Sequence, residues 1–191
     1  MTPSLHSFAD IHTHDLTAAG RPDSVVNLTP SDALPPAGNF SVGIHPWDTS
    51  AGEPTLTSLK ALVRMARDPR TVAVGEAGFD RMRGGDIELQ RRVFDFHARL
   101  AERVGKPLII HAVKADDLLA AAIRRHRPSV EWIIHGFRGN ATRARQLLRM
   151  GFSLSLGHRF NPEAEAVIPP DRLYHESDAP ARSCPEKGFQ S

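Results

Sequence analysis

The sequence predicts a stripped-down (β/α)8 barrel, an α/β fold of TIM type in which some of the helices are missing. Short apolar runs rich in Val and Ile, bounded by Gly, Pro or Asp, recur about eight times along the chain. Eight is the strand number of such a barrel, and helical patterns separate several of the runs. A regular barrel needs about 250 residues. This chain has 191, so we expect a distorted barrel without its full set of helices.

The strands are expected where the apolar runs lie, at residues 8–12, 24–28, 40–44, 71–75, 107–111, 131–135, 152–156 and 172–176. The clearest helix is 86–104, whose apolar residues repeat at helical spacing before Gly105. Further helices are predicted around 56–63, around 118–123 and from Asn140 to Gly151. The links after the first, second and seventh strands are too short or too rich in proline for full helices.

Composition fits a single domain over residues 1–191, with an irregular tail at 181–191 that has no helical period. The net charge is only +2, but the isoelectric point of about 9.0 allows a mild attraction to partners that carry phosphate. A single cysteine, Cys184, rules out an internal disulfide. No secretory leader or membrane-spanning run is recognised, so we expect a cytoplasmic protein with no membrane contact, and a monomer.

Six residues that make good metal ligands lie at the C-terminal ends of the predicted strands: His12, His14, Glu76, His111, His135 and Asp178. Strand ends on one rim of a barrel converge on one point. His12 and His14 are two residues apart and share a strand face, although such a triplet also arises by chance in a chain with 10 histidines. For His111 or His135 taken alone, a buried core residue is the better interpretation. Six groups that are costly to bury, all at one barrel end, instead favour a shared metal site.

The two acids add chemistry that imidazole does not offer. Glu76 could bridge two ions, and its neighbours Gly75 and Gly78 indicate a closely approached backbone. Asp178 could bind metal and accept a proton from metal-bound water. Asp10 shares the parity of His12 and is expected to anchor a ligand imidazole from one step lower on the strand.

Six motifs run in order through the chain: DIHTH (10–14), GIHPWD (43–48), GEAGFD (75–80), IIHAVKA (109–115), IIHGFRGN (133–140) and ESDAP (176–180). With them the chain resembles the TatD-like hydrolases, metal-dependent deoxyribonucleases of the amidohydrolase superfamily, and especially a short bacterial branch. The resemblance implies two divalent ions, of Zn, Mn or Mg. It implies that His12, His14 and Asp178 hold one ion and that His111 and His135 hold the other. Glu76 would bridge them, and Asp178 would be the general base.

Several rim residues are candidates for substrate binding. Arg138 stands where the family more often carries Ser, and Lys114 where longer members often carry Arg, so both could bind phosphate. The alternative for each is a salt bridge, with Asp116 or Asp117 available to Lys114. Trp47 could stack on a base or simply pack a loop. His45 is expected to contact substrate or leaving group, and His158 is a weaker candidate of the same kind.

The function predicted from these residues is two-metal hydrolysis of phosphodiester bonds, with DNA or a small phosphodiester as substrate and trimming of DNA ends as the expected mode. An amidohydrolase that cleaves a C–N or carboxylic-ester bond at the same metals is the enzymatic alternative. The basic residues Lys114 and Arg138 favour phosphate. A metal-binding protein without catalysis is a third possibility, against which the acids Glu76 and Asp178 argue.

Overall fold

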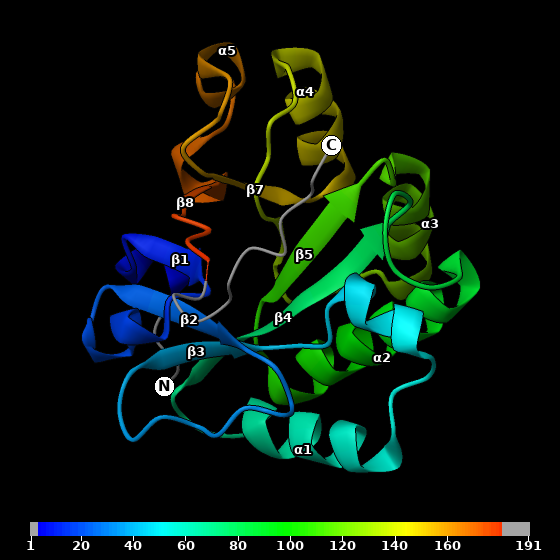
Figure 1. Cartoon of the computed structure of the whole chain (residues 1–191). Helices are drawn as coiled ribbons and strands as arrows, with labels where there is room; N and C mark the ends of the chain where they lie inside the picture. Colours follow the sequence, from blue (N-terminus) through cyan, green and yellow to red (C-terminus); the bar gives the residue numbers. More distant parts are fainter. Residues whose placement is uncertain (1–3, 181–191) are drawn as a thin grey trace, which may run out of the picture.

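The computed structural model describes residues 4–180, which form one eight-stranded parallel sheet curved into a barrel (Figure 1). The strands lie side by side in sequence order. They are β1 (Asp10–Thr13), β2 (Ser24–Leu28), β3 (Asn39–Val42), β4 (Thr71–Asp80), β5 (Leu108–Val113), β6 (Trp132–Ile134), β7 (Ser153–Leu156) and β8 (Leu173–His175). All eight predicted strands are therefore present, and the prediction of a (β/α)8-type barrel is confirmed.

The helices are as uneven as the sequence predicts. The α-helices are α1 (Leu56–Ala66), α2 (Ile87–Val104), α3 (Asp116–His126), α4 (Ala141–Met150) and the single turn α5 (Pro162–Glu165). Short 3-10 helices lie before β1 and in several links: η1 (Leu5–Ser7), η2 (Leu16–Gly20), η3 (Pro46–Ala51) and η4 (Pro170–Arg172). The link between β2 and β3 has no helix. Within residues 4–180 no helix is long and apolar enough to cross a bilayer.

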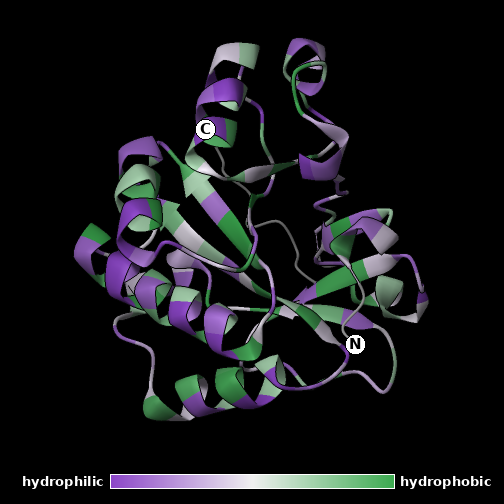
Figure 2. Cartoon of the chain, turned by 180° about the vertical axis from the view of Figure 1, so that it is seen from behind, coloured by the Kyte–Doolittle hydropathy of each residue, from purple (hydrophilic) through white to green (hydrophobic). Residues whose placement is uncertain are grey.

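Two apolar clusters hold the barrel together. The larger lies between the strands and the outer helices α1 to α4, whose hydrophilic and hydrophobic residues alternate along each helix (Figure 2). The smaller joins residues from opposite strands, among them Ile11, Ile109 and Ile133, and so fills the inside of the barrel. His111 and His135 follow Ile109 and Ile133 by two residues, and strand alternation turns them to the same inner side.

The fourth strand is longer than predicted, running from Thr71 to Asp80 instead of 71–75, and all of it is buried. The prediction stopped at Gly75 because glycine usually weakens a strand. Here Gly75 and Gly78 let β4 approach β5 closely, since a Cβ at either position would overlap a backbone oxygen of β5. The extra length carries Glu76 and Asp80 into the barrel mouth.

The barrel closes without a regular strand pair between β8 and β1. Hydrogen-bonded strand pairing among the described residues runs from β1 to β8 and stops there. The segment after β8 makes the closing contacts instead: Asp178 N donates to His12 O at 3.0 Å, and His14 N donates to Ala179 O at 2.9 Å. His12 and Asp178, both predicted metal ligands, are thus joined by a backbone hydrogen bond.

Candidate metal centre

The six predicted ligands converge on one place at the C-terminal ends of the strands, and Glu76 lies at its centre. Glu76 is 2% exposed, with Oε2 at 3.2 Å from His12 Nε2 and 3.5 Å from His14 Nε2. Its other oxygen, Oε1, lies 2.7 Å from His111 Nδ1 and 2.6 Å from His135 Nε2. Each carboxylate oxygen therefore faces a different pair of histidines, which is the arrangement that a bridging ligand needs.

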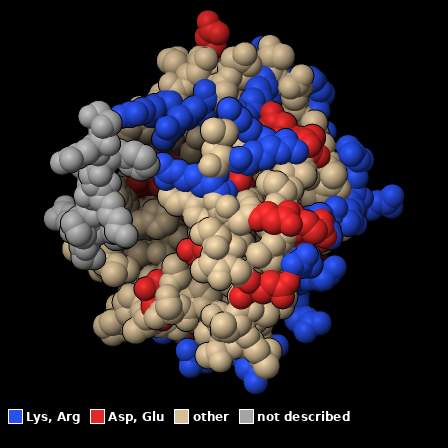
Figure 3. Space-filling view, turned by 45° about the vertical axis from the view of Figure 1, so that its right-hand side comes forward, with Lys and Arg blue, Asp and Glu red and all other residues tan. Residues whose placement is uncertain are grey.

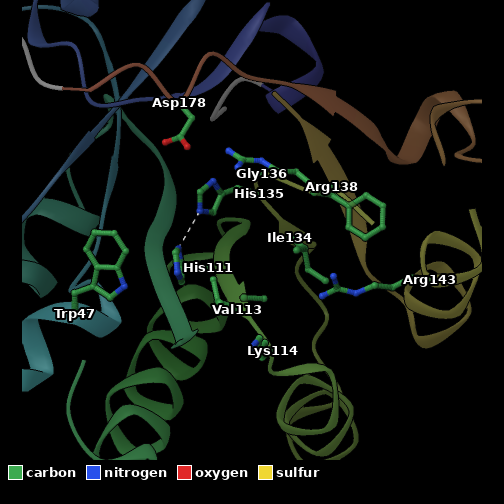
Figure 4. Close-up of a pocket in the computed structure, with 12 residues that line it drawn as sticks. Trp47, His111, Val113, Lys114, Ile134, His135, Gly136, Arg138, Arg143 and Asp178 are labelled. Atoms are coloured by element: carbon green, nitrogen blue, oxygen red, sulfur yellow. Dashed lines mark hydrogen bonds between the residues drawn. The ribbon is translucent and has the colours of Figure 1, made fainter. Parts of the chain in front are cut away.

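Asp178 lies on the open side of this cluster. Its Oδ1 is 3.9 Å from both His12 Nε2 and His14 Nε2, and its side chain is 36% exposed. Figure 4 shows its carboxylate pointing toward His135 and the pocket in front of His111. Asp178 also groups with His12 and His135 in a set whose ligand atoms all lie within 4.8 Å of one another. It is thus the acid of the cluster with the easiest access to water.

A bulge in β4 and a buried amide set the position of Glu76. Three residue steps of β4, from Val74 to Ala77, lie opposite two steps of β5, and this irregularity is where Glu76 turns into the barrel. Its backbone N–H donates to Asn27 Oδ1 at 2.9 Å, and the same oxygen accepts from Ser41 Oγ at 3.0 Å. Three adjacent strands, β2, β3 and β4, are therefore tied together directly behind the central carboxylate.

The electrostatics of the cluster favour opposite charges at its centre. Burial opposes ionisation of Glu76, but the charge of His135 and the hydrogen bond from His111 outweigh it and hold the Glu76 pKa well below its usual value. Burial likewise opposes a charged His135, while the carboxylates of Glu76 and Glu176 raise the His135 pKa well above its usual value. Divalent cations can replace these shared protons, because the donor set of imidazole and carboxylate suits them.

His12 gives a direct test of whether the residues fit a metal. Both of its ring nitrogens are buried and neither has a hydrogen-bond partner among the residues that the structure describes. The Nε2 contact with Glu76 at 3.2 Å satisfies the distance of an ion pair but does not make a hydrogen bond. Buried polar atoms of this kind need a partner. A cation between His12, His14 and Glu76 would supply one, so the residues fit the expected metal.

His45 lies inside the cluster rather than at its edge. Its Nε2 is 3.1 Å from Glu76 Oε1 and 3.2 Å from His111 Nδ1. Its Nδ1 accepts a hydrogen bond from the Trp47 backbone at 3.1 Å. A neutral imidazole that accepts at Nδ1 carries its proton on Nε2. His45 therefore presents an N–H donor to the cluster, and a donor is what the predicted contact with substrate or leaving group requires.

Two carboxylates that sequence reasoning missed lie behind the second histidine pair. Asp80 Oδ2 is 3.2 Å from His111 Nε2, and Glu176 Oε1 is 3.2 Å from His135 Nδ1. A carboxylate behind a metal-binding histidine fixes its tautomer and orients its ring. Both acids lie within the GEAGFD and ESDAP motifs, two or four residues from an acid already singled out. This closeness in sequence to Glu76 and Asp178 was the signal from which the two acids could have been predicted.

The role predicted for Asp10 is wrong. Its carboxylate bonds no imidazole among the described residues; it accepts from Ser177 Oγ at 2.6 Å and from Ser177 N at 3.0 Å. It also accepts from the backbone N–H of His12 at 3.2 Å. Asp10 therefore joins the start of the barrel to its end. His158 is exposed on the turn after β7 and has no contact with the cluster.

A pocket of about 500 Å³ opens beside the cluster, and Trp47, Lys114, Arg138 and Asp178 are among its lining residues (Figure 4). Lys and Arg side chains gather around a hollow on this side of the molecule (Figure 3). Trp47 is 41% exposed, and its indole N–H donates to Asp80 Oδ2 at 2.6 Å. Its ring is therefore fixed at the pocket entrance.

The basic residues of the pocket differ in their partners. Arg143 also lines it, but its guanidinium pairs with Asp116 at 2.7 and 2.9 Å. Asp117 is held in the same bidentate way by Arg81, at 2.6 and 2.7 Å. Both acids that could have paired with Lys114 are thus engaged elsewhere, so that alternative is wrong. Within residues 4–180, neither Lys114 nor Arg138 forms an ion pair.

Comparisons with known proteins agree with the motifs and the fold. The chain is 34% identical over 153 residues to an uncharacterized metal-dependent hydrolase TatD of Mycobacterium tuberculosis, with 73% of this chain and 57% of the relative covered. It is 31% identical over 150 residues to a 3'-5' ssDNA/RNA exonuclease TatD of Pantoea vagans, with 73% and 57% covered. The chain thus spans a little over half the length of these curated relatives.

The fold similarity extends further than the sequence matches. The crystal structure of YjjV, a TatD homologue of Escherichia coli, superposes with a TM-score of 0.73 at 27% identity, covering 98% of this chain and 84% of that one. A family model described as TatD related DNase matches residues 24–190. With its motifs, barrel and clustered ligands, the chain belongs to the family of TatD-related DNases.

Proposed function

We propose that this chain is a metal-dependent phosphodiesterase that uses two divalent cations and trims the ends of single-stranded nucleic acid. The division of Glu76 between two pairs of histidines is the observation that carries the proposal. Oε2 faces His12 and His14, and Oε1 faces His111 and His135. A single ion would leave one of these pairs without a ligand role.

Each side chain of the cluster has a distinct task in this proposal. His12, His14 and Asp178 would hold one ion, His111 and His135 the other, and Glu76 both. Cations held by these residues would supply Lewis acidity, which lowers the pKa of a water molecule and neutralises the charge that develops on phosphate oxygens. Asp178, exposed to the pocket, accepts the proton of the attacking water at a carboxylate oxygen. His45 donates its Nε2 proton in a hydrogen bond to a phosphate or leaving-group oxygen.

The pocket supports phosphate over a neutral substrate. Lys114 and Arg138 have no acidic partner in the described part of the chain, and both line the pocket beside His111 and His135. Unpaired cations in a pocket favour an anionic ligand. The exposed Trp47 ring at the same pocket would stack on a nucleobase. The relative from Pantoea vagans carries the name of an ssDNA/RNA exonuclease, and that similarity is the second support for a nucleic-acid substrate.

The enzymatic alternative is cleavage of a C–N or carboxylic-ester bond at the same cluster. An apolar pocket from which Lys114 and Arg138 were absent would have favoured it, and both residues line this pocket. A metal-binding protein without catalysis is disfavoured because Asp178 and Glu76 both lie at the cluster. The cytoplasmic location, the monomeric state and the choice among Zn, Mn and Mg stay predictions.

Three substrates and a set of metals test the proposal. Purified protein is stripped with a chelator and loaded in turn with Zn²⁺, Mn²⁺ or Mg²⁺. It is then assayed on single-stranded DNA labelled at one end, on bis(p-nitrophenyl) phosphate and on p-nitrophenyl acetate. We expect metal-dependent cleavage of the first two and about two cations bound per chain by elemental analysis. Hydrolysis of the acetate ester alone, or full activity in the metal-free protein, would contradict the proposal.

A further inference from the structure

The short segment that follows β8 carries Glu176 and Asp178 to the cluster, yet it is not part of any strand. Its middle residue, Ser177, is bonded twice to the Asp10 carboxylate, through its hydroxyl at 2.6 Å and its backbone N–H at 3.0 Å. The two residues are 167 positions apart in sequence. Among the described residues, this contact is the side-chain part of the closure between the last strand and the first.

The position of Asp178 depends on this closure. No hydrogen bond to its carboxylate is found within residues 4–180, and its Oδ1 lies 3.9 Å from the His12 and His14 rings. Its backbone φ is +47°, in the left-handed region that a non-glycine residue adopts at a cost. Its hydrogen bond to the barrel, among the residues that the structure describes, is the one that its backbone N–H donates to His12 O at 3.0 Å. A residue in this conformation keeps it when its neighbours are held firmly.

We infer that Asp10 and Ser177 form a positioning pair that holds the Asp178 carboxylate at the metal centre. The Asp10 carboxylate accepts from His12 N as well as from Ser177, so one side chain sets the relative placement of a metal ligand and of the segment that bears the base. The inference rests on the proposed function for its effect on turnover. Its effect on ligand geometry stands independently of any substrate.

The geometry predicts a loss of rate with little loss of fold. Ser177→Ala removes the bond at 2.6 Å and keeps the backbone bond to Asp10, so the segment stays attached but gains freedom. Misplacement of a catalytic group by about 1 Å costs on the order of 100-fold in rate. We therefore expect kcat to fall about 10- to 100-fold while KM changes less than about threefold. Ser177→Thr keeps the hydroxyl and should recover most of the rate.

The experiment compares wild type, Ser177→Ala, Ser177→Thr, Asp10→Asn and the matched control Ser31→Ala. Ser31 also bonds through its hydroxyl, to Thr29 Oγ1 at 2.7 Å, in an exposed loop outside the metal pocket. For each protein we would measure kcat and KM on single-stranded DNA, the melting temperature without metal, and the visible spectrum with Co²⁺ bound. The Co²⁺ spectrum reports ligand geometry whether or not a substrate is turned over.

The outcomes separate this inference from the proposed function. An altered Co²⁺ spectrum in Ser177→Ala and Asp10→Asn, with the melting temperatures of Ser177→Ala and Ser31→Ala within about 2 °C of wild type, supports the positioning role. A Co²⁺ spectrum in Ser177→Ala identical to that of wild type would overturn it, even if wild type is active. So would a rate loss that Ser177→Thr does not recover. Absence of phosphodiester hydrolysis in wild type would instead refute the proposed function, while the spectra still test the pair.

Discussion

Replacement of Asp178 by Asn should separate the two roles proposed for this residue, metal binding and proton transfer. The side chain is 36% exposed, and no hydrogen bond to its carboxylate is found in the described residues, so the fold loses no bond of that carboxylate. The backbone at φ +47° suits asparagine as well as aspartate, because both tolerate the left-handed region. We therefore expect the free energy of unfolding of the metal-free protein to change by less than about 0.5 kcal/mol.

The expected loss in Asp178→Asn is catalytic. The amide keeps one oxygen that can coordinate, and the other ligands proposed for the two ions, Glu76 among them, are untouched, so metal content should fall only in part. An amide does not accept the proton of a metal-bound water, and loss of a general base costs about 10²- to 10⁴-fold in rate. Elemental analysis and single-turnover hydrolysis of labelled single-stranded DNA on the same sample measure both effects.

One result would refute this reasoning. If the variant keeps its metals and turns over within a few-fold of wild type, Asp178 serves only as a ligand. The general base would then have to be another group at the cluster. If the variant instead loses both ions, Asp178 has a larger share in metal binding than its distance of 3.9 Å from His12 and His14 indicates.

Three further predictions follow from other parts of the structure. Arg138→Ala should lower kcat/KM for phosphodiesters about 10- to 100-fold and leave activity on any carboxylic ester unchanged. Arg145→Ala, an exposed control outside the pocket, should change neither activity. Equal losses on both substrates would contradict the role of Arg138 in phosphate binding. Burial lowers the pKa of His97 from 6.5 to about 4, so its neutral form stabilises the fold above pH 6.5 and this contribution is lost as pH falls toward 4. In urea unfolding, the advantage of metal-free wild type over His97→Gln should shrink by about 2–3 kcal/mol between pH 7 and pH 4.5, and a constant difference would contradict the assignment. Asn27→Ala removes the acceptor for Glu76 N and should lower the free energy of unfolding by about 1–3 kcal/mol. It should also lower the metal affinity measured by calorimetric titration; an unchanged affinity would show that this bond does not position Glu76.

Much of the site could be predicted from local patterns. A parallel strand brings its C-terminal residue to a common rim, and alternation places residues two apart on one face, so His12, His14, Glu76, His111 and His135 were recognisable from their places at the ends of apolar runs. The short links around β2 and β8 also followed from composition, because proline and short length leave no room for a helix. These features depend only on residues close together in the sequence.

The tertiary structure decided what depends on register and closure. Glu76 turns inward at a bulge in β4, where Gly75 and Gly78 allow a close approach to β5, and the strand continues to Asp80 although Gly75 predicted its end. The contacts of Asp80 with His111 and of Glu176 with His135 depend on the orientation of the imidazole rings, which only the tertiary structure shows.

Hydrogen bonds between residues distant in sequence explain the remaining differences between the predicted and the observed partners. Lys114 has no ion pair among the described residues because its neighbouring acids, Asp116 and Asp117, bind Arg143 and Arg81 instead. Spacing along the chain does not reveal these pairs. Asp10 meets Ser177 across 167 positions. By itself the sequence determined which side chains meet at the rim, since strand direction and alternation are local. Only the closed barrel decided which of them bond to each other, since those bonds form between strands that are remote in the chain.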